Sequence, residues 1–299
     1  MNDTLTLTLK NDYLFKLLLG SEENKACLQD FLECVLDMPA GFIADLELLD
    51  KELAKDTITD KTGILDVKLR LKDRTTIDIE IQNGWSVEFI PRTLFYWSKM
   101  YFQGFKEGEP YTNLTKCITI NLIAYGFKLD SDVHSTYSIL EQNTHKLLTD
   151  LMEIHFLNLA AAQKYGVQRN PIEKRQKLIN WLQFIETDNS EVRKMIATTS
   201  PILQMLNEKI DVLSLSPKER KLYESRMKLK SDIATISAAQ YSAGIERGKS
   251  LGLAEGKAQG SHQKALETAY LMKQANCEAA FIAKMTGLSY AEISALGNS

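Results

Sequence analysis

Two short segments in the first third of the chain alternate between apolar and polar positions. Between residues 65 and 72, and again from 77 to 82, every odd position is apolar and every even position is polar or charged. Alternation with a period of two predicts strands with one face in the core. The short connection through residues 73 and 74 predicts that the two strands form an antiparallel hairpin.

The turn of this hairpin determines which polar residues face one another. Matching the two apolar faces requires paired residues whose numbers have an even sum, which an odd-length turn provides. Asp66 then lies opposite Glu80 or opposite Gln82. Either register predicts one polar surface that carries Asp66, Glu80 and Gln82, with Lys68 beside them.

Apolar residues at helical spacing flank the hairpin. They predict one or two helices between residues 12 and 36, with Asp12 as the first N-cap. A further helix is expected after Pro91, to about residue 106. Its core-facing stripe would contain Leu94, Trp97 and Tyr101.

Two more segments are typical of strands, an apolar run at 117–124 and an alternating one at 152–159. The order helix, hairpin, helix, strand predicts an α/β domain over residues 1–165. The pattern then becomes helical, and we expect a helical region at 166–240 and a separate C-terminal module at 241–299.

Glycine recurs at every fourth position between residues 244 and 260. Each glycine costs a helix about 1 kcal/mol relative to alanine, so the segment is either a flexible connector or a helix in close contact with a partner. Good helix formers occupy the intervening positions, which favours the helix. We therefore expect a homo-oligomer formed through the C-terminal module, which is also a candidate regulatory element.

Composition limits the classes of protein that remain. Hydrophobic residues make up 44 % of the chain and charged residues 25 %, and the net charge is −3. No apolar run approaches the length of a membrane span, so we expect a cytoplasmic protein without a membrane partner. Six lysines and arginines lie within residues 217–230. They form either a nucleic-acid-binding stripe or a solvated helix face.

The polar surface of the hairpin is the strongest candidate for chemistry. Two carboxylates on adjacent strands, Asp66 and Glu80, form a hard oxygen site suited to Mg²⁺ or Mn²⁺. Such an ion polarises a phosphoryl oxygen and acidifies water, which phosphodiester hydrolysis requires. The alternative is that acids occupy the solvent-facing side of a half-buried hairpin. The four histidines show no metal-ligand spacing, and His155 is expected at the surface.

Three stretches together resemble a known family. They are NDYLFKLLLG, ILDVKLRLKDRTTIDIEIQ and PRTLFYWSKMYFQGFKEGEPY. They are similar to the recombination-promoting nuclease/putative transposase family of the PD-(D/E)XK nuclease superfamily, over most of residues 10–185. The resemblance implies an α/β PD-(D/E)XK restriction-endonuclease-like core with a helical C-terminal extension.

The resemblance also implies roles for individual residues. Asp66 and Glu80 would bind the metal together with the backbone carbonyl of Ile81. Gln82 occupies the position where most of the superfamily has lysine, and it offers only neutral hydrogen bonds. Lys68 is a candidate to supply the missing charge. Asp12 matches a family position and would be either a further metal-binding acid or the helix N-cap.

Three residues of the helix after Pro91 are candidates for contacts with DNA. Arg92 and Tyr96 lie one turn apart and, with Lys99, would hold a phosphate. The alternative is that Arg92 and Tyr96 anchor the helix to the sheet. The function implied is a Mg²⁺-dependent DNA endonuclease of low sequence specificity, linked to recombination, mobile DNA or defence against invading DNA. The alternative is a non-catalytic DNA-binding or oligomeric interaction protein with a degenerate site.

Overall fold

The computed structural model describes residues 7–50, 65–83, 87–103, 105–124, 132–167, 174–213 and 215–296. The chain forms two compact units, residues 1–234 and 235–299. The division that we predicted at residues 165 and 240 stays a prediction. In the described part of the chain, no helix is both long and apolar enough to cross a membrane.

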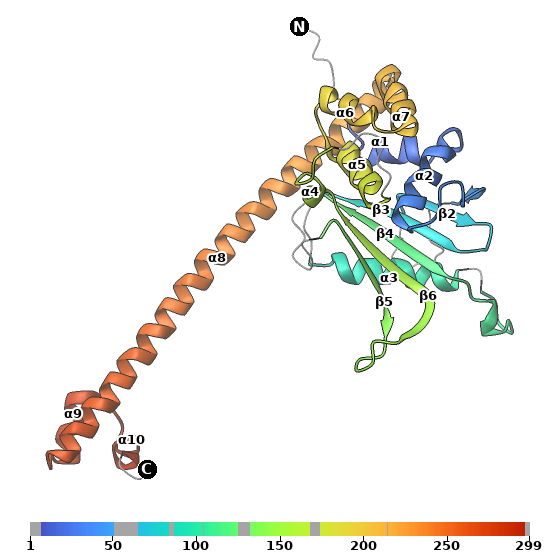
Figure 1. The fold of residues 1–299 in the computed structure, drawn as a ribbon. Helices are drawn as coiled ribbons and strands as arrows, with labels where there is room; N and C mark the ends of the chain where they lie inside the picture. Colours follow the sequence, from blue (N-terminus) through green and yellow to red (C-terminus); the bar gives the residue numbers. More distant parts are fainter. Residues whose placement is uncertain are drawn as a thin grey trace, which may run out of the picture. The chain divides into compact units, whose positions relative to one another are not determined.

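The first unit contains a six-stranded mixed sheet with the strand order β1-β2-β3-β4-β6-β5 (Figure 1). β3, β4 and β6 are parallel to one another, whereas β1 and β5 are antiparallel to their neighbours β2 and β6. The bounds of the strands are β1 Leu46–Leu48, β2 Val67–Leu71, β3 Thr76–Gln82, β4 Cys117–Ile123, β5 His134–Leu140 and β6 Leu147–Asn158.

The predicted hairpin is present with one of the two predicted registers. Val67 pairs with Ile79 and Lys68 with Asp78, which gives the even sum of 146. The Leu71 N–H donates to the Thr75 carbonyl, so the turn has three residues and an odd length. Arg74 takes a φ of 73° to close this turn. The register places Asp66 level with Glu80, as one of the two alternatives required.

The odd-numbered positions of the hairpin face the main core. The apolar residues of β2 and β3 pack there with those of β4 and with helices that precede and follow the sheet in the chain. These helices lie on the side of the sheet opposite α3 (Figure 1). They are α1 Asp12–Leu19, the 3₁₀ turn η1 Glu22–Asn24, α2 Lys25–Val35, α4 Leu159–Ala162, α5 Lys174–Glu186, α6 Ser190–Ala197 and α7 Pro201–Val212.

The prediction that Asp12 caps the first helix was wrong. The N-cap is Asn11, which has an extended backbone and whose side-chain oxygen accepts hydrogen bonds from the N–H groups of Tyr13 and Leu14. Asp12 is the first helical residue, where its charge favours the positive end of the helix dipole. Aspartate and asparagine are about equally good caps, so the sequence pattern was correct only to within one residue.

The other face of the sheet is covered by α3, Phe89–Phe102. This helix begins before Pro91 rather than after it, and it ends about four residues earlier than expected. Trp97 and Tyr101 pack towards Leu65, Met100 and Cys117. Leu94 is 44 % exposed and does not belong to the packed stripe, because Thr93 is the residue buried at that turn.

The edge strand β5 was missed by the sequence analysis. It forms a hairpin with β6, which begins five residues before the predicted strand. The expectation that His155 lies at the surface was also wrong. His155 is 4 % exposed, its Nδ1 lies 2.9 Å from His134 Nε2, and the two rings stack.

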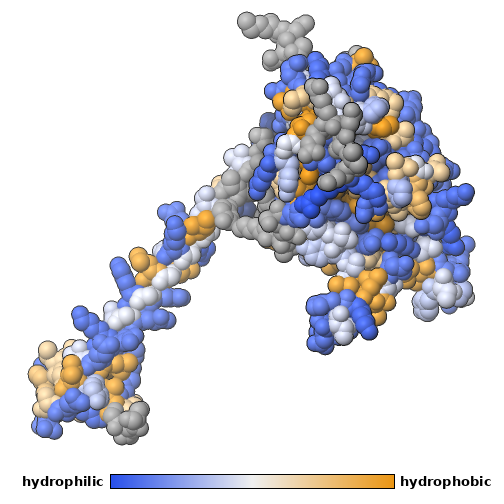
Figure 2. Space-filling model, viewed as in Figure 1, coloured by the Kyte–Doolittle hydropathy of each residue, from blue (hydrophilic) through white to orange (hydrophobic). Residues whose placement is uncertain are grey.

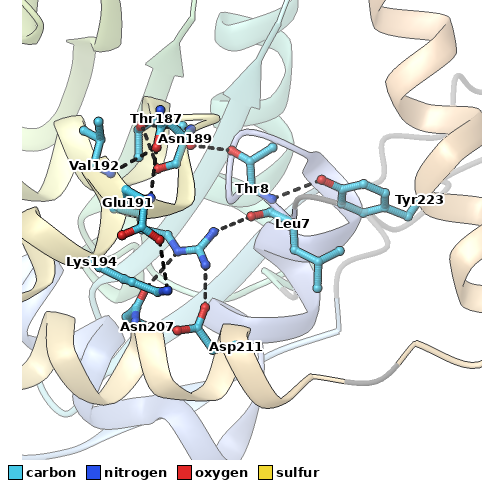
Figure 3. A network of polar contacts seen from close by, with 11 residues as sticks. Leu7, Thr8, Thr187, Asn189, Glu191, Val192, Lys194, Asn207, Asp211 and Tyr223 are labelled. Atoms are coloured by element: carbon cyan, nitrogen blue, oxygen red, sulfur yellow. Dashed lines mark hydrogen bonds and ion pairs between the residues drawn. The ribbon is translucent and has the colours of Figure 1, made fainter. Parts of the chain in front are cut away.

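A buried arginine ties the N-terminal segment to the helices α6 and α7. Arg193 donates to the Leu7 carbonyl, to Asn207 and to Asp211, at 2.6, 2.9 and 2.7 Å respectively. Figure 3 shows Leu7, Asn207 and Asp211 grouped in this network. The three acceptors satisfy a guanidinium that would otherwise be costly to bury.

The helix α8 runs from Pro217 to Gln274, so the glycine-spaced segment is helical as predicted. Its side chains between residues 242 and 261 are exposed, and apolar and polar residues are interspersed along it (Figure 2). In the second unit, α9 Ala279–Thr286 and α10 Tyr290–Ala295 pack against the end of α8 through a small apolar cluster. Gly287 separates them with a φ of 73°, which glycine adopts readily.

Candidate active site

The two predicted metal-binding carboxylates lie together on the α3 side of the hairpin. Asp66 immediately precedes β2 and Glu80 lies in β3, and each contacts the backbone next to the other. The Asp66 N–H donates to Glu80 Oε1 at 3.0 Å, and the Ile81 N–H donates to Asp66 Oδ2 at 2.9 Å. The strand register and these two hydrogen bonds therefore fix the positions of both side chains.

This polar face is buried, which excludes the alternative that the acids lie on the solvent-facing side of the hairpin. Asp66 is 6 % exposed, Glu80 is 7 % exposed and Asp78 is 1 % exposed. Oδ1 of Asp78 has no hydrogen-bond partner among the described residues. Three carboxyl groups thus lie in one buried row. Asp78 was not among the predicted site residues, because the predicted registers were considered only for the partner of Asp66.

Burial and mutual repulsion make these acids hold their protons strongly. Burial is the main cause that raises the pKa of Glu80 to about 8, and the charge of Asp66 adds to it. Burial also raises the pKa of Asp66, against the opposing effect of Lys16. The pKa of Asp78 is raised well above its ordinary value by burial and then by Glu80 and Asp66. Perturbation of several groups in one place is typical of functional sites.

Gln82 links the acids to α3. Its amide nitrogen donates to Glu80 Oε2 at 3.3 Å, and its oxygen accepts a hydrogen bond of 2.5 Å from Arg92. Tyr96 lies one turn further along the helix, and its pKa is raised by burial and then by the charge of Glu80. Arg92 and Tyr96 are therefore both within electrostatic reach of the carboxylates.

The other two predicted residues on this face have different surroundings. Lys68 pairs with Asp78 in the strand register, and its ammonium donates to Gln103 at 2.5 Å, near the end of α3. Burial lowers the pKa of Lys68. Lys99 lies 5.4 Å from the ring centre of Phe102, one turn beyond Tyr96. The roles of both lysines stay predictions.

The residue that the sequence analysis overlooked is Lys16 on α1. Its ammonium forms an ion pair of 2.7 Å with Asp66 Oδ1. Asp12, one turn earlier, raises the pKa of Asp66 only weakly and forms an ion pair of 3.4 Å with Arg226 of α8. The signal for Lys16 was present, because it is the lysine of the N-terminal Asp-x-x-Phe-Lys segment that carries part of the resemblance.

The donor set fits a divalent cation by its chemistry. Carboxylate and carbonyl oxygens are the preferred ligands of Mg²⁺ and Mn²⁺, and Asp66, Glu80 and the Ile81 carbonyl would supply them. The raised pKa values support this fit, since a bound cation would offset the repulsion between the two carboxylates. Among the described residues, no cluster of three or more histidine, cysteine or acidic side chains is arranged to hold a metal. The candidate metal centre thus consists of the carboxylates of Asp66 and Glu80 and the backbone carbonyl of Ile81.

Of three comparisons with known proteins, the one with family profiles finds a match. Comparison with curated proteins finds no significant match, and comparison with solved structures also finds none. The sequence profile of the PD-(D/E)XK nuclease family transposases matches residues 9–239, which include the whole carboxylate site and the start of α8. The match supports a nuclease- or transposase-like function and an α/β PD-(D/E)XK-like fold. Because the match covers more than three quarters of its length, the chain belongs to the PD-(D/E)XK nuclease family transposases.

Proposed function

We propose that this protein is a divalent-metal-dependent DNA endonuclease that hydrolyses phosphodiester bonds with low sequence specificity. The observation that carries the proposal is the buried pair Asp66 and Glu80, held across adjacent strands by each other's backbone. Burying acids is costly unless something compensates for their charge. A divalent cation is the compensation that suits two carboxylates and also serves hydrolysis.

The residues of the site would have two roles, metal binding and orientation of the attacking water. Asp66, Glu80 and the Ile81 carbonyl would hold Mg²⁺ or Mn²⁺, and Asp12 is a further candidate ligand. The ion, when bound, polarises a phosphoryl oxygen and lowers the pKa of water at the site. Gln82, fixed by Arg92, would orient the attacking water through its amide.

The DNA would be bound mainly through its phosphates. Arg92 and Tyr96 on α3 flank the carboxylates, and Lys99 extends the same helix face by another turn. Contacts to phosphate carry no sequence information, so binding through phosphates supports low sequence specificity. Such an activity would serve recombination, mobile DNA or defence against invading DNA.

The direct test is cleavage of supercoiled plasmid by the purified full-length protein with Mg²⁺, with Mn²⁺ and with EDTA. Asp66→Asn and Glu80→Gln keep the shape of each side chain and remove its charge. We expect nicking or linearisation that needs the metal and is lost in both variants. Glu107→Gln, an exposed acid after α3, is the matched control and should cleave like the wild type. Absence of cleavage by a folded wild type would favour a DNA-binding protein with a degenerate site.

We also propose that the glycine-spaced part of α8 joins two copies of the chain. A Cβ atom added at any of these glycines would meet no atom within 4 Å beyond the neighbouring residues and the backbone of its own helix. The exposed apolar residues Ile245, Leu251 and Leu253 lie beside them. A solvated helix with five glycines is poorly stable alone, and a close-packed second helix would compensate for this.

Light scattering after size-exclusion chromatography tests this association. The wild type should be oligomeric, and Gly252→Leu should dissociate it, because a leucine would keep the two helices apart. The control is Ala254→Leu, an exposed position about 200° around the same helix from Gly252. A monomeric wild type, or an oligomer that tolerates leucine at position 252, would refute the association.

A further inference from the structure

A lysine contributed by the first helix contacts the carboxylate pair directly. Lys16 Nζ lies 2.7 Å from Asp66 Oδ1, and its side chain is half-buried. The charge of Lys16 opposes the rise in the pKa of all three acids, Asp66, Asp78 and Glu80. Its ammonium is therefore within electrostatic reach of the whole acidic row.

The position of Lys16 is fixed by the fold. The helix α1 is capped by Asn11, and Leu14, Phe15, Leu18 and Leu19 bury its core-facing side. The Asn11 amide also donates to the carbonyl of Tyr223, so the beginning of α1 is attached to α8. With the backbone held in this way, the ammonium of Lys16 can move only by rotation of its own side chain.

The hydrolysis of a phosphodiester needs positive charge close to the reacting phosphorus. Negative charge grows on the phosphoryl oxygens in the transition state, and lysine or arginine commonly stabilises it in addition to the metal. Gln82 is neutral, Arg92 donates to Gln82, and Lys68 donates to Gln103. In the described part of the site, Lys16 is the ammonium group that contacts a metal-binding carboxylate.

We propose that Lys16 is a catalytic cation of the nuclease site, an inference that rests on the proposed function. Without metal, Lys16 neutralises Asp66. With Asp66 engaged in holding a divalent cation, the ammonium of Lys16 would be free to donate to a non-bridging oxygen of the scissile phosphate. The bond from the water oxygen to phosphorus forms as the bond to the leaving oxygen breaks. The proton of the water passes to solvent, the leaving oxygen takes up a proton from solvent, and Lys16 neither gives up nor accepts one.

A purely structural role for Lys16 makes different predictions. If Lys16 only neutralised Asp66 in the metal-free protein, its removal would free a carboxylate for the metal. Metal binding would then become tighter and cleavage would persist. A catalytic cation can also compete with the metal for Asp66, but its loss must slow the chemical step at saturating metal.

The experiment compares Lys16→Met and Lys16→Arg with the wild type and with Lys25→Met. Lys25 is the control because it forms an ordinary surface ion pair with Glu22 at the start of α2. Mn²⁺ binding without DNA is measured by calorimetry, folding by circular dichroism, and cleavage under single-turnover conditions at saturating Mg²⁺. Lys16→Met should bind Mn²⁺ at least as tightly as the wild type and cleave about 100-fold more slowly, the typical effect of losing one transition-state contact. Lys16→Arg should recover part of the rate.

A second variant relocates the charge. Gln82→Lys combined with Lys16→Met places an ammonium beside Glu80 from β3, and it should cleave faster than Lys16→Met alone. Cleavage by Lys16→Met within about threefold of the wild type would overturn the proposal, and so would loss of Mn²⁺ binding in this variant. If the wild type shows no metal-dependent cleavage, the proposed function fails and this proposal fails with it. If the wild type cleaves and Lys16→Met does too, only the role of Lys16 is refuted.

Discussion

Replacing Glu80 by glutamine should stabilise the metal-free protein at high pH. The pKa of this carboxyl is raised from its ordinary value of 4.5 to about 8, chiefly by burial. The folded protein therefore keeps a proton that the unfolded chain loses between pH 4.5 and 8. The free energy of unfolding of the wild type falls as the pH rises through this window, by up to 1.36 kcal/mol for each pH unit. Glutamine removes this loss because it never ionises.

The size of the effect follows from the same window. The interval from 4.5 to about 8 corresponds to about 5 kcal/mol if the whole penalty is retained. Hydration and local movement around the charged group relieve part of it, so we expect about 2 to 5 kcal/mol at pH 9. Below pH 4.5 both states are protonated, and the two proteins should differ little. The glutamine oxygen can still accept the Asp66 N–H, so the hydrogen bond at 3.0 Å is preserved.

Urea denaturation in EDTA at pH 4.5, 7 and 9 measures these differences. The tryptophans Trp85, Trp97 and Trp181 all precede residue 234, so their fluorescence reports on the first unit. Excess Mg²⁺ should stabilise the wild type at pH 9 and have a smaller effect on Glu80→Gln. Glu107→Gln is the control for a change of net charge. A Glu80→Gln protein that is no more stable than the wild type at pH 9 would refute the reasoning.

Three further predictions concern other parts of the first unit. Lys218, Lys221 and Lys228 lie opposite the buried Tyr223 on α8 and are exposed. If they contact phosphates, changing all three to glutamine should reduce the steepness of log affinity against log salt concentration by about 2 to 3. Filter binding in the Asp66→Asn background measures this slope, and an unchanged slope would contradict the contact. Arg193→Met should cost about 2 to 4 kcal/mol in urea denaturation, because it removes the donor of the Leu7 carbonyl and of Asn207, whereas Asp211 is partly exposed and can turn to water (Figure 3). A loss below about 1 kcal/mol would contradict this. Burial and the neighbouring His155 lower the pKa of His134 to about 4. As the pH falls from 6.5 to 4, the unfolded chain therefore binds a proton that the folded protein does not, and the folded protein is destabilised. His134→Gln should reduce this acid destabilisation by about 1 to 2 kcal/mol, after allowance for partial exposure, and equal acid sensitivity of the two proteins would contradict the prediction.

The sequence was most informative where a regular alternation of apolar and polar residues extended over a whole strand. Alternation in residues 65–72 and 77–82 predicted the hairpin, its odd-length turn and the common face of Asp66 and Glu80, all of which the structure contains. The pattern did not reveal that this face is buried, because alternation shows which positions share a face and not what covers that face. The cover is α3, and its aromatic residues pack on the polar side of the hairpin.

Features that depend on single side chains or distant contacts were less predictable. Asn11 and Asp12 are both good N-caps, so the boundary was wrong by one residue. The edge strand β5 has no alternating burial, since its outer residues are mostly exposed. The contact of Lys16 with Asp66 joins residues 50 positions apart, so the local periodicity of the sequence does not predict it.

The geometry of the site and the stability of the core have a common determinant in the register of the hairpin. The odd-numbered residues of β2 and β3 bury isoleucine, leucine and valine on one face, so the even-numbered residues are forced to the other. Asp66, Asp78 and Glu80 are therefore placed together by the same pairing that builds the core, although their burial is unfavourable for folding without a cation. A shift of one residue would expose the apolar side chains to α3 and place acids in the core. The core thus holds the carboxylates in an arrangement that they would not adopt by themselves, and a bound cation would turn this strained arrangement into a favourable one.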